Sequence, residues 1–260
     1  MEKQSTIQMD YFSFGSGAKT MVILPGLGTR SILFSEMMIR AAYRQFERDY
    51  TVYVFDRRTD LPPVYTIREM ARDTAAKMRE LGLRDADVFG ASLGGMVAQY
   101  LAADAPELVH AMALGSTAPY TNTLFAAVAK EWTDAAENGD LTALTAAMIS
   151  RLFSEATVRQ YGDVLTHMND GLTGKELRRF AIQGRAASGF DAREALQRVH
   201  CPTLVIGVKG DKVLTGEASE ELAALLRCRL YLYPDTYGHC VFDEAKDYKD
   251  RLMQFFISTR

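Results

Sequence analysis

The stretch that decides the fold runs from Val88 to Met96 and reads VFGASLGGM. Its centre, GASLG at 90–94, fits the pattern G-x-S-x-G of a serine held on a sharp turn between a strand and a helix. Small neighbours suit such a turn because they let strand and helix pack closely around a strained serine. Residues 85–89 are typical of a buried strand, and residues 96–103 are good helix formers. We therefore predict Ser92 as a nucleophile; the alternative is that it only caps the helix.

Composition sets outer bounds on function. The 260 residues suffice for one α/β core, and 48% hydrophobic and 24% charged residues are ordinary globular values. A net charge of -3 provides no basic field, so we expect no nucleic-acid partner. The chain carries neither a signal-peptide pattern nor a run of ~20 apolar residues, so we expect a cytoplasmic protein without membrane contact. Its three cysteines, Cys201, Cys228 and Cys240, form no C-x-x-C pair and predict neither disulfides nor a metal site.

Strand patterns alternate with helical ones on both sides of a helical middle. This alternation predicts an α/β fold with a mostly parallel, eight-stranded sheet flanked by helices. The predicted strands are Thr6–Met9, Tyr11–Phe14, Thr20–Leu24, Thr51–Phe55, Ala86–Phe89, Val109–Leu114, Thr203–Val208 and Arg229–Tyr233, the first two as a hairpin-like pair. Long helices are predicted for Ile32–Phe46, Ile67–Leu81, Glu217–Leu226 and Val241–Phe256.

Residues 119–190 carry helical periodicity only. We interpret them as a helical cap inserted into the core, which then comprises residues 1–118 and 191–260. Five large apolar residues of this segment either line a pocket or pack the cap helices on each other; they are Phe125, Trp132, Met148, Phe153 and Met168.

A serine nucleophile needs a base, and the base needs an orienting group. Of four histidines, His239 alone follows a predicted strand at the carboxyl edge of the sheet, in the run YLYPDTYGH. Gly238 before it allows a tight turn toward Ser92. Asp211, in the loop after the Thr203–Val208 strand, is the candidate orienting acid, and Asp235 is the alternative.

An oxyanion would need backbone donors beside Ser92. Leu93 supplies one N–H as the residue after the nucleophile, and Leu27 in the loop PGLG at 25–28 is the candidate for the second. The same loop begins like a dinucleotide fingerprint, but Ser31 stands where the third glycine belongs. We therefore expect no nucleotide, no other cofactor and no metal.

Taken together, these motifs resemble the α/β-hydrolase family over nearly the whole chain: LPGLG at 24–28, FDRR at 55–58, FGASLGG at 89–95, GDK at 210–212 and GH at 238–239. Residues 65–73 and 81–99 look most like small lidded esterases and 3-oxoadipate enol-lactonases. The resemblance implies a serine hydrolase with the triad Ser92, His239 and Asp211. It would cleave a small carboxylic ester, thioester or lactone through an acyl-enzyme intermediate, as a monomer or homodimer.

The chain departs from its relatives in two loops. Pro25-Gly26 replaces a His-Gly pair that can brace the first loop, and the residues after Arg58 differ from a frequent Gly-His-Gly. Arg57 and Arg58 either bind a substrate carboxylate or form ion pairs at the strand end.

Three other functions stay open at this stage. An aminopeptidase-like amide hydrolase would use acidic cap residues, for which Glu131, Asp134, Glu137 and Glu155 are the candidates. A small-ligand receptor could keep the triad with little turnover, and a perhydrolase would use peroxide in place of water.

Overall fold

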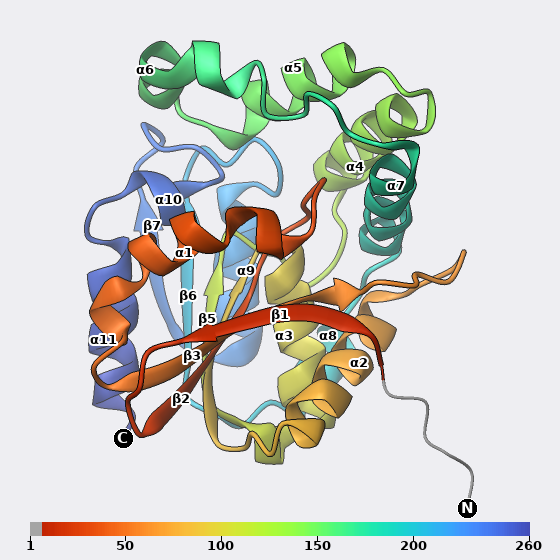
Figure 1. The fold of residues 1–260 in the computed structure, drawn as a ribbon. Helices are drawn as coiled ribbons and strands as arrows, with labels where there is room; N and C mark the ends of the chain where they lie inside the picture. The colour runs from red at the N-terminus through yellow and green to blue at the C-terminus, as the bar shows by residue number, and fades with distance from the viewer. Residues whose placement is uncertain (1–6) are drawn as a thin grey trace, which may run out of the picture.

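The computed structural model describes residues 7–260, which form a sheet with helices on both faces and further helices above one edge (Figure 1). The strands are β1 (Met9–Phe14), β2 (Lys19–Leu24), β3 (Tyr50–Arg58), β4 (Ala86–Ala91), β5 (Val109–Gly115), β6 (Thr203–Val208) and β7 (Arg229–Tyr233). The helices are α1 (Glu36–Ala42), α2 (Ile67–Glu80), α3 (Leu93–Asp104), α4 (Thr123–Glu137), α5 (Leu141–Leu152), α6 (Glu155–Leu165), α7 (Gly174–Ser188), α8 (Arg193–Leu196), α9 (Gly216–Leu226), α10 (Val241–Glu244) and α11 (Tyr248–Ser258).

The sheet runs in the order β1-β3-β2-β4-β5-β6-β7, with β1 antiparallel to β3 and the other pairs parallel. The prediction of a mostly parallel sheet is confirmed, but the described residues form seven strands and not eight. Met9 and residues 11–14 belong to the single strand β1, which pairs with β3 instead of forming a hairpin with an earlier strand. Thr6, the start of the other predicted strand, lies outside the described residues.

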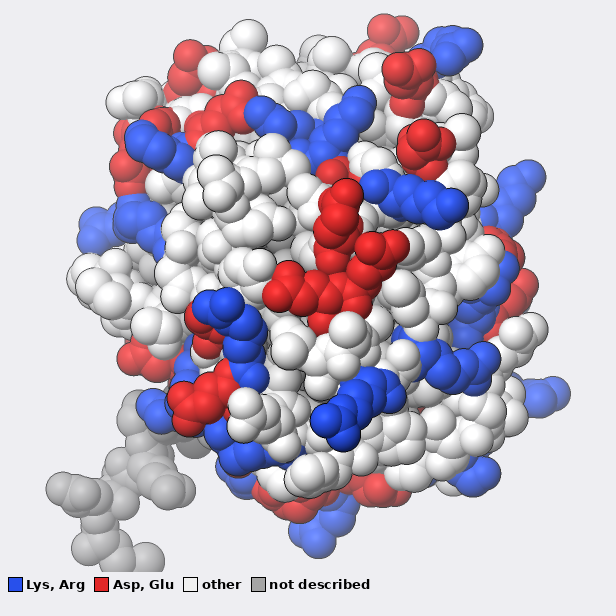
Figure 2. All heavy atoms as spheres, turned by 180° about the vertical axis from the view of Figure 1, so that it is seen from behind, with Lys and Arg blue, Asp and Glu red and all other residues white. Residues whose placement is uncertain are grey.

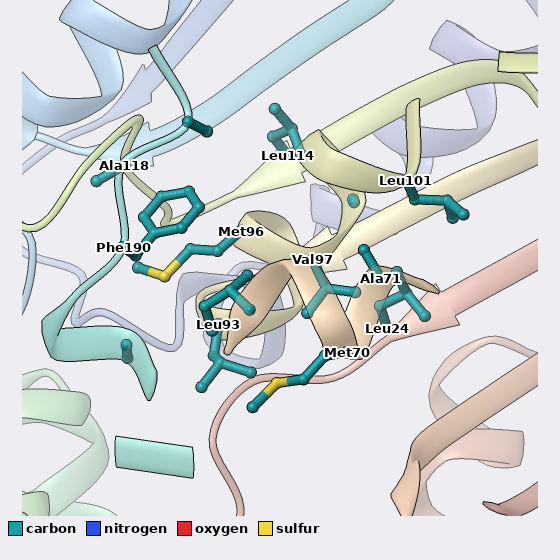
Figure 3. Packing of buried hydrophobic residues seen from close by; sticks show 14 of the residues in the cluster. Leu24, Met70, Ala71, Leu93, Met96, Val97, Leu101, Leu114, Ala118 and Phe190 are labelled. Carbon is teal, nitrogen blue, oxygen red and sulfur yellow. The ribbon is translucent and has the colours of Figure 1, made fainter. Parts of the chain in front are cut away.

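Side chains alternate between two apolar cores, one on each face of the sheet. Along β2, Val22 and Leu24 belong to the core shared with α2 and α3, whereas Met21 and Ile23 belong to the core shared with α11. Figure 3 shows part of the first core, in which Leu93, Met96 and Val97 of α3 pack among side chains of other elements. Helix α3, which directly follows Ser92, is therefore buried along most of its length and has little freedom to move.

Two long predicted helices are broken in the structure. Ile32–Phe46 consists of a 3-10 turn (Ile32–Ser35), α1 and a second 3-10 turn (Arg44–Phe46). The break places Tyr43 and Phe46 in the sheet core, where their exposed fractions are 5% and 0%. The C-terminal helix is likewise split into α10 and α11, because Ala245 adopts an extended conformation with ψ 121°.

Helices α4 to α7 follow β5 and lie above the carboxyl edge of the parallel strands (Figure 1). We call them the cap; that residues 119–190 form a separate domain stays a prediction. Phe125, Trp132 and Met148 are buried in the core cluster that includes the cap helices, whereas Phe153 and Met168 are partly buried against it. For the first three residues, packing of the cap is the function that the structure supports.

Candidate active site

Ser92 occupies the turn between β4 and α3 in a strained backbone conformation. Its φ is 51° and its ψ is -120°, in a region that residues with a side chain seldom adopt. Such strain costs about 1–3 kcal/mol and persists only where neighbours enforce it. Two hydrogen bonds do so here: Ser92 N donates to Gly115 O at 2.8 Å, and Thr117 Oγ1 donates to Ser92 O at 2.8 Å. The turn therefore holds Ser92 in one orientation at the start of α3.

The glycines around Ser92 are needed for close approach. A Cβ on Gly90 would lie 2.5 Å from Gly94 O, and a Cβ on Gly94 would lie 1.9 Å from Leu24 O. Neither distance is compatible with a side chain, so the prediction that small residues permit close strand and helix packing is confirmed.

Three polar side chains from three separate loops meet at this turn. His239 Nε2 lies 3.0 Å from Ser92 Oγ, and His239 Nδ1 lies 2.8 Å from Asp211 Oδ2. The His239 and Asp211 side chains are each 2% exposed. Asp211 Oδ1 also accepts the backbone N–H groups of Val213 and Leu214, at 2.8 and 3.1 Å. The arrangement can pass a proton from the serine hydroxyl to an imidazole whose other nitrogen faces a fixed carboxylate.

The structure brings together the three residues that the sequence predicts as a triad. The alternative acid, Asp235, packs beside Gly210 and has no hydrogen bond to His239. His110 and His167 make contacts elsewhere, with Asp85 and Asp170 respectively. Gly238 is needed for a different reason than the predicted tight turn. Its φ is not positive, but a Cβ at this position would lie 2.5 Å from the backbone of Phe153.

The loop that carries Leu27 lies directly against Ser92. A Cβ on Gly26 would lie 3.3 Å from Ser92 Cβ. Within residues 7–260, the backbone N–H groups of Leu27 and Leu93 donate to no acceptor of the protein. Two N–H groups next to or near Ser92 are therefore available to an acceptor that arrives with a ligand.

Arg57 braces this loop, a role that sequence reasoning missed. Its Nη2 donates to Pro25 O at 2.7 Å, and the residue is 2% exposed. Burial lowers the pKa of Arg57 to about 10, a change that the adjacent Asp56 carboxylate partly offsets. The guanidinium therefore stays charged at neutral pH. Of the two alternatives left open for Arg58, ion pairing is observed, with Asp60 at 3.0 Å and Asp73 at 3.6 Å.

The cap is also tied to the Leu27 loop through a buried asparagine. Thr29 Oγ1 donates to Asn169 Oδ1 at 3.1 Å, and Asn169 Nδ2 donates to Thr145 Oγ1 of α5 at 3.1 Å. Asn169 is 1% exposed. No local pattern marks this residue, because its partners lie far from it along the chain.

Three observations on the described residues concern other kinds of site. No group of three or more His, Cys, Asp or Glu residues within 7–260 could hold a metal ion. No helix in this range is long and apolar enough to cross a membrane. The face seen in Figure 2 carries cationic and anionic side chains interspersed, with a group of acidic ones near its centre, and shows no continuous basic surface.

Comparison with known proteins identifies the family. Residues 19–246 match the model of the alpha/beta hydrolase fold family, and the chain belongs to that family. A proposed carbamate hydrolase, RutD, from Pseudomonas syringae is 26% identical over 257 residues, which cover 94% of this chain and 95% of that protein. A 3-oxoadipate enol-lactonase from Acinetobacter baylyi is 25% identical over 219 residues, covering 80% of this chain and 78% of the lactonase. The family and these relatives together support a hydrolase.

Solved structures agree on the fold. An alpha/beta hydrolase enzyme from a Medee basin deep-sea metagenome library superposes with a TM-score of 0.86 at 20% identity, over 97% of this chain and 95% of that one.

Proposed function

We propose that this protein hydrolyses a small carboxylic ester, thioester or lactone through an acyl-enzyme formed on Ser92. The observation that carries the proposal is the continuous contact from Asp211 through His239 to Ser92 Oγ, with 2.8 and 3.0 Å between the interacting atoms. The named enol-lactonase and proposed carbamate hydrolase among the relatives support hydrolysis at an acyl carbon.

In the first half of the reaction, Ser92 Oγ attacks the carbonyl carbon and its proton passes to His239 Nε2. Asp211 stabilises the imidazolium through its contact with Nδ1. The carbonyl oxygen becomes an oxyanion that accepts the N–H groups of Leu27 and Leu93. Each such donor is worth about 10²–10³ in turnover.

In the second half, the tetrahedral intermediate collapses and its bond to the leaving group breaks. His239 returns the proton to the leaving alkoxide or thiolate. Water then attacks the acyl-enzyme, His239 takes a proton from that water, and the acid is released as Ser92 regains its hydrogen. General acid and base assistance of this kind is worth about 10²–10⁴ in rate. The chain itself supplies every group that these steps need.

The amide-hydrolase alternative has less support. Its four candidate residues for binding an amino group are exposed, and three already have cationic partners: Glu131 with Arg151, Asp134 with Lys130 and Glu137 with Arg185. Anchoring an α-amino group would require these carboxylates to exchange partners. The receptor and perhydrolase alternatives remain for experiment, as do the cytoplasmic location and the choice between monomer and homodimer.

Labelling with a fluorophosphonate probe, followed by mass spectrometry, tests the proposal. We expect one adduct, on Ser92, that is absent from Ser92→Ala and forms about 10²–10⁴ times more slowly in His239→Ala. Multiple turnover of short esters and lactones should accompany it. Well-folded protein that forms no adduct would contradict the proposal and favour a ligand-binding role.

A further inference from the structure

The chain around His239 lies against the junction between α5 and α6 of the cap. A Cβ on Gly238 would lie 2.5 Å from the carbonyl carbon of Phe153 and 2.6 Å from Leu152 O. On the other side of His239, Cys240 N donates to Leu152 O at 2.9 Å. Backbone therefore touches backbone here, and the cap and the His239 loop have no side chain between them.

The carboxylate of Glu244 joins the same two segments. Its Oε2 accepts the N–H of Gly238 at 2.7 Å, and its Oε1 accepts the N–H of Ser154 at 2.7 Å. Neither N–H has another acceptor within residues 7–260. Hydrogen bonds to a charged acceptor are roughly twice as strong as neutral ones. Glu244 is thus a bridge between the cap and the residue directly before His239.

These contacts fix the backbone on both sides of His239: Gly238 through Glu244, and Cys240 through Leu152. Inside the site, the imidazole contacts Asp211 through Nδ1 and Ser92 Oγ through Nε2. We propose that Glu244 is a positioning residue that couples the cap to His239, so that displacement of the α5–α6 junction displaces the base. This inference rests on the proposed function of Ser92.

The cap has a second connection that strengthens this coupling. Asn169 links Thr145 of α5 to Thr29 in the loop that follows Leu27. Helix α5 therefore contacts the His239 loop near its C-terminal end, and Thr145 is linked to the Leu27 loop through Asn169. A cap that moves as one body would shift the base and a proposed oxyanion donor together.

Two variants weaken the bridge from opposite sides. Glu244→Gln keeps one acceptor oxygen but places an NH₂ group against one of the two N–H groups. Ser154→Pro removes the N–H on the cap side together with the Ser154 hydroxyl. Its backbone dihedrals suit proline, because Ser154 has φ -67° and Phe153 is extended, with φ -112° and ψ 152°. The two variants should have the same consequence at Ser92.

Each variant has a matched control. Ser154→Ala is the control for Ser154→Pro: it keeps the backbone N–H but, like the proline variant, loses the Ser154 hydroxyl. This hydroxyl caps α6 by accepting the N–H of Thr157. Asp243→Asn alters the neighbouring carboxylate of α10, which pairs with Lys249 and contacts neither Gly238 nor Ser154. A purely structural role for Glu244 would lower the melting temperature of its variant but leave the labelling rate of the folded protein unchanged.

The measurement is the second-order rate of fluorophosphonate labelling at Ser92 at 25 °C, together with kcat and KM for a short ester, on variants shown to be folded by circular dichroism. Glu244→Gln and Ser154→Pro should label about 10- to 100-fold more slowly, because displacement of a catalytic group by about 1 Å costs up to about 10²-fold. The loss should fall on kcat more than on KM. Both controls should stay within about twofold of the unmodified protein.

Labelling of both variants at the unmodified rate would overturn the inference and leave the proposed function standing. The coupling to the cap would be overturned if Glu244→Gln labels slowly but Ser154→Pro labels at the same rate as Ser154→Ala. If Glu244→Gln does not fold, Ser154→Pro against Ser154→Ala decides the question. Unmodified protein that never labels at Ser92 would refute the proposed function, and the inference would fall with it.

Discussion

Asp211→Asn is the sharpest test of the proposed triad, because the geometry dictates how an amide would sit. Asp211 Oδ1 accepts the N–H groups of Val213 and Leu214 and lies 3.0 Å from His239 Nδ1, whereas Oδ2 makes the shorter contact with Nδ1, at 2.8 Å, and accepts neither backbone N–H. An asparagine keeps its oxygen toward the two N–H groups and turns its NH₂ toward His239. The imidazole nitrogen must then accept a hydrogen bond, so the ring proton moves to Nε2. In that tautomer, His239 cannot take the proton of Ser92.

The expected loss is about 10⁴ in kcat, the magnitude that the wrong tautomer costs in a serine triad. It corresponds to about 5.5 kcal/mol of transition-state stabilisation, at about 1.4 kcal/mol per factor of ten. The fold should survive, because the two loop hydrogen bonds are retained. The assay is hydrolysis of p-nitrophenyl acetate, with Asp235→Asn as the matched control and an expected change within about twofold. A folded Asp211→Asn variant with less than a tenfold loss would refute the assignment of Asp211 as the orienting acid.

Three further predictions concern the surroundings of the site. Gly94→Ala forces a Cβ against Leu24 O, so we expect the free energy of unfolding to fall by about 3 kcal/mol and the melting temperature by about 6–12 °C. A melting temperature that changes by less than about 2 °C in calorimetry would contradict the packing argument. Arg57→Met removes the donor to Pro25 O, and kcat for the same ester should fall about 10- to 100-fold with little change in KM, whereas an unchanged kcat would mean that the loop needs no brace. Burial raises the pKa of Cys228 to about 11, so iodoacetamide should alkylate this thiol about 200-fold more slowly at pH 8 than it alkylates a free thiol. The alkylation rate should rise about tenfold with each pH unit up to pH 10. Equal alkylation rates of Cys228 in folded and denatured protein would argue against the raised pKa.

Local sequence patterns predicted those parts of the fold in which neighbouring residues determine the structure. Helix α2 was predicted as 67–81 from its helical pattern, and in the structure it ends at Glu80. The structure adds a capping box at its start, formed by Thr66 and Glu69. The split of the C-terminal helix at Ala245 was not predicted. The helical pattern continues through this point, and the break depends on how α10 and α11 each reach the core.

The candidate site divides in the same way. Ser92, Asp211 and His239 could be chosen from sequence because each follows a strand, and the carboxyl ends of parallel strands share one edge of a sheet. Arg57 could not be assigned to a role, because it lies in β3 and its partner Pro25 lies in a loop 32 residues away along the chain, and both of its possible roles require the same side chain. Glu244 carried no signal at all, since its two partners are backbone N–H groups of distant segments.

The sequence by itself therefore determined the strand–turn–helix around Ser92, the α/β class and the order of the three proposed triad residues along the chain. These features depend on small residues, hydrophobic periodicity and turn chemistry within short windows. Only the tertiary structure decided that Asp211 and not Asp235 faces His239, that Arg57 braces the loop beside Ser92, and that Glu244 joins the cap to the residue before His239. Those contacts join residues far apart in the chain, and which polar group finds which partner is settled only when the elements pack.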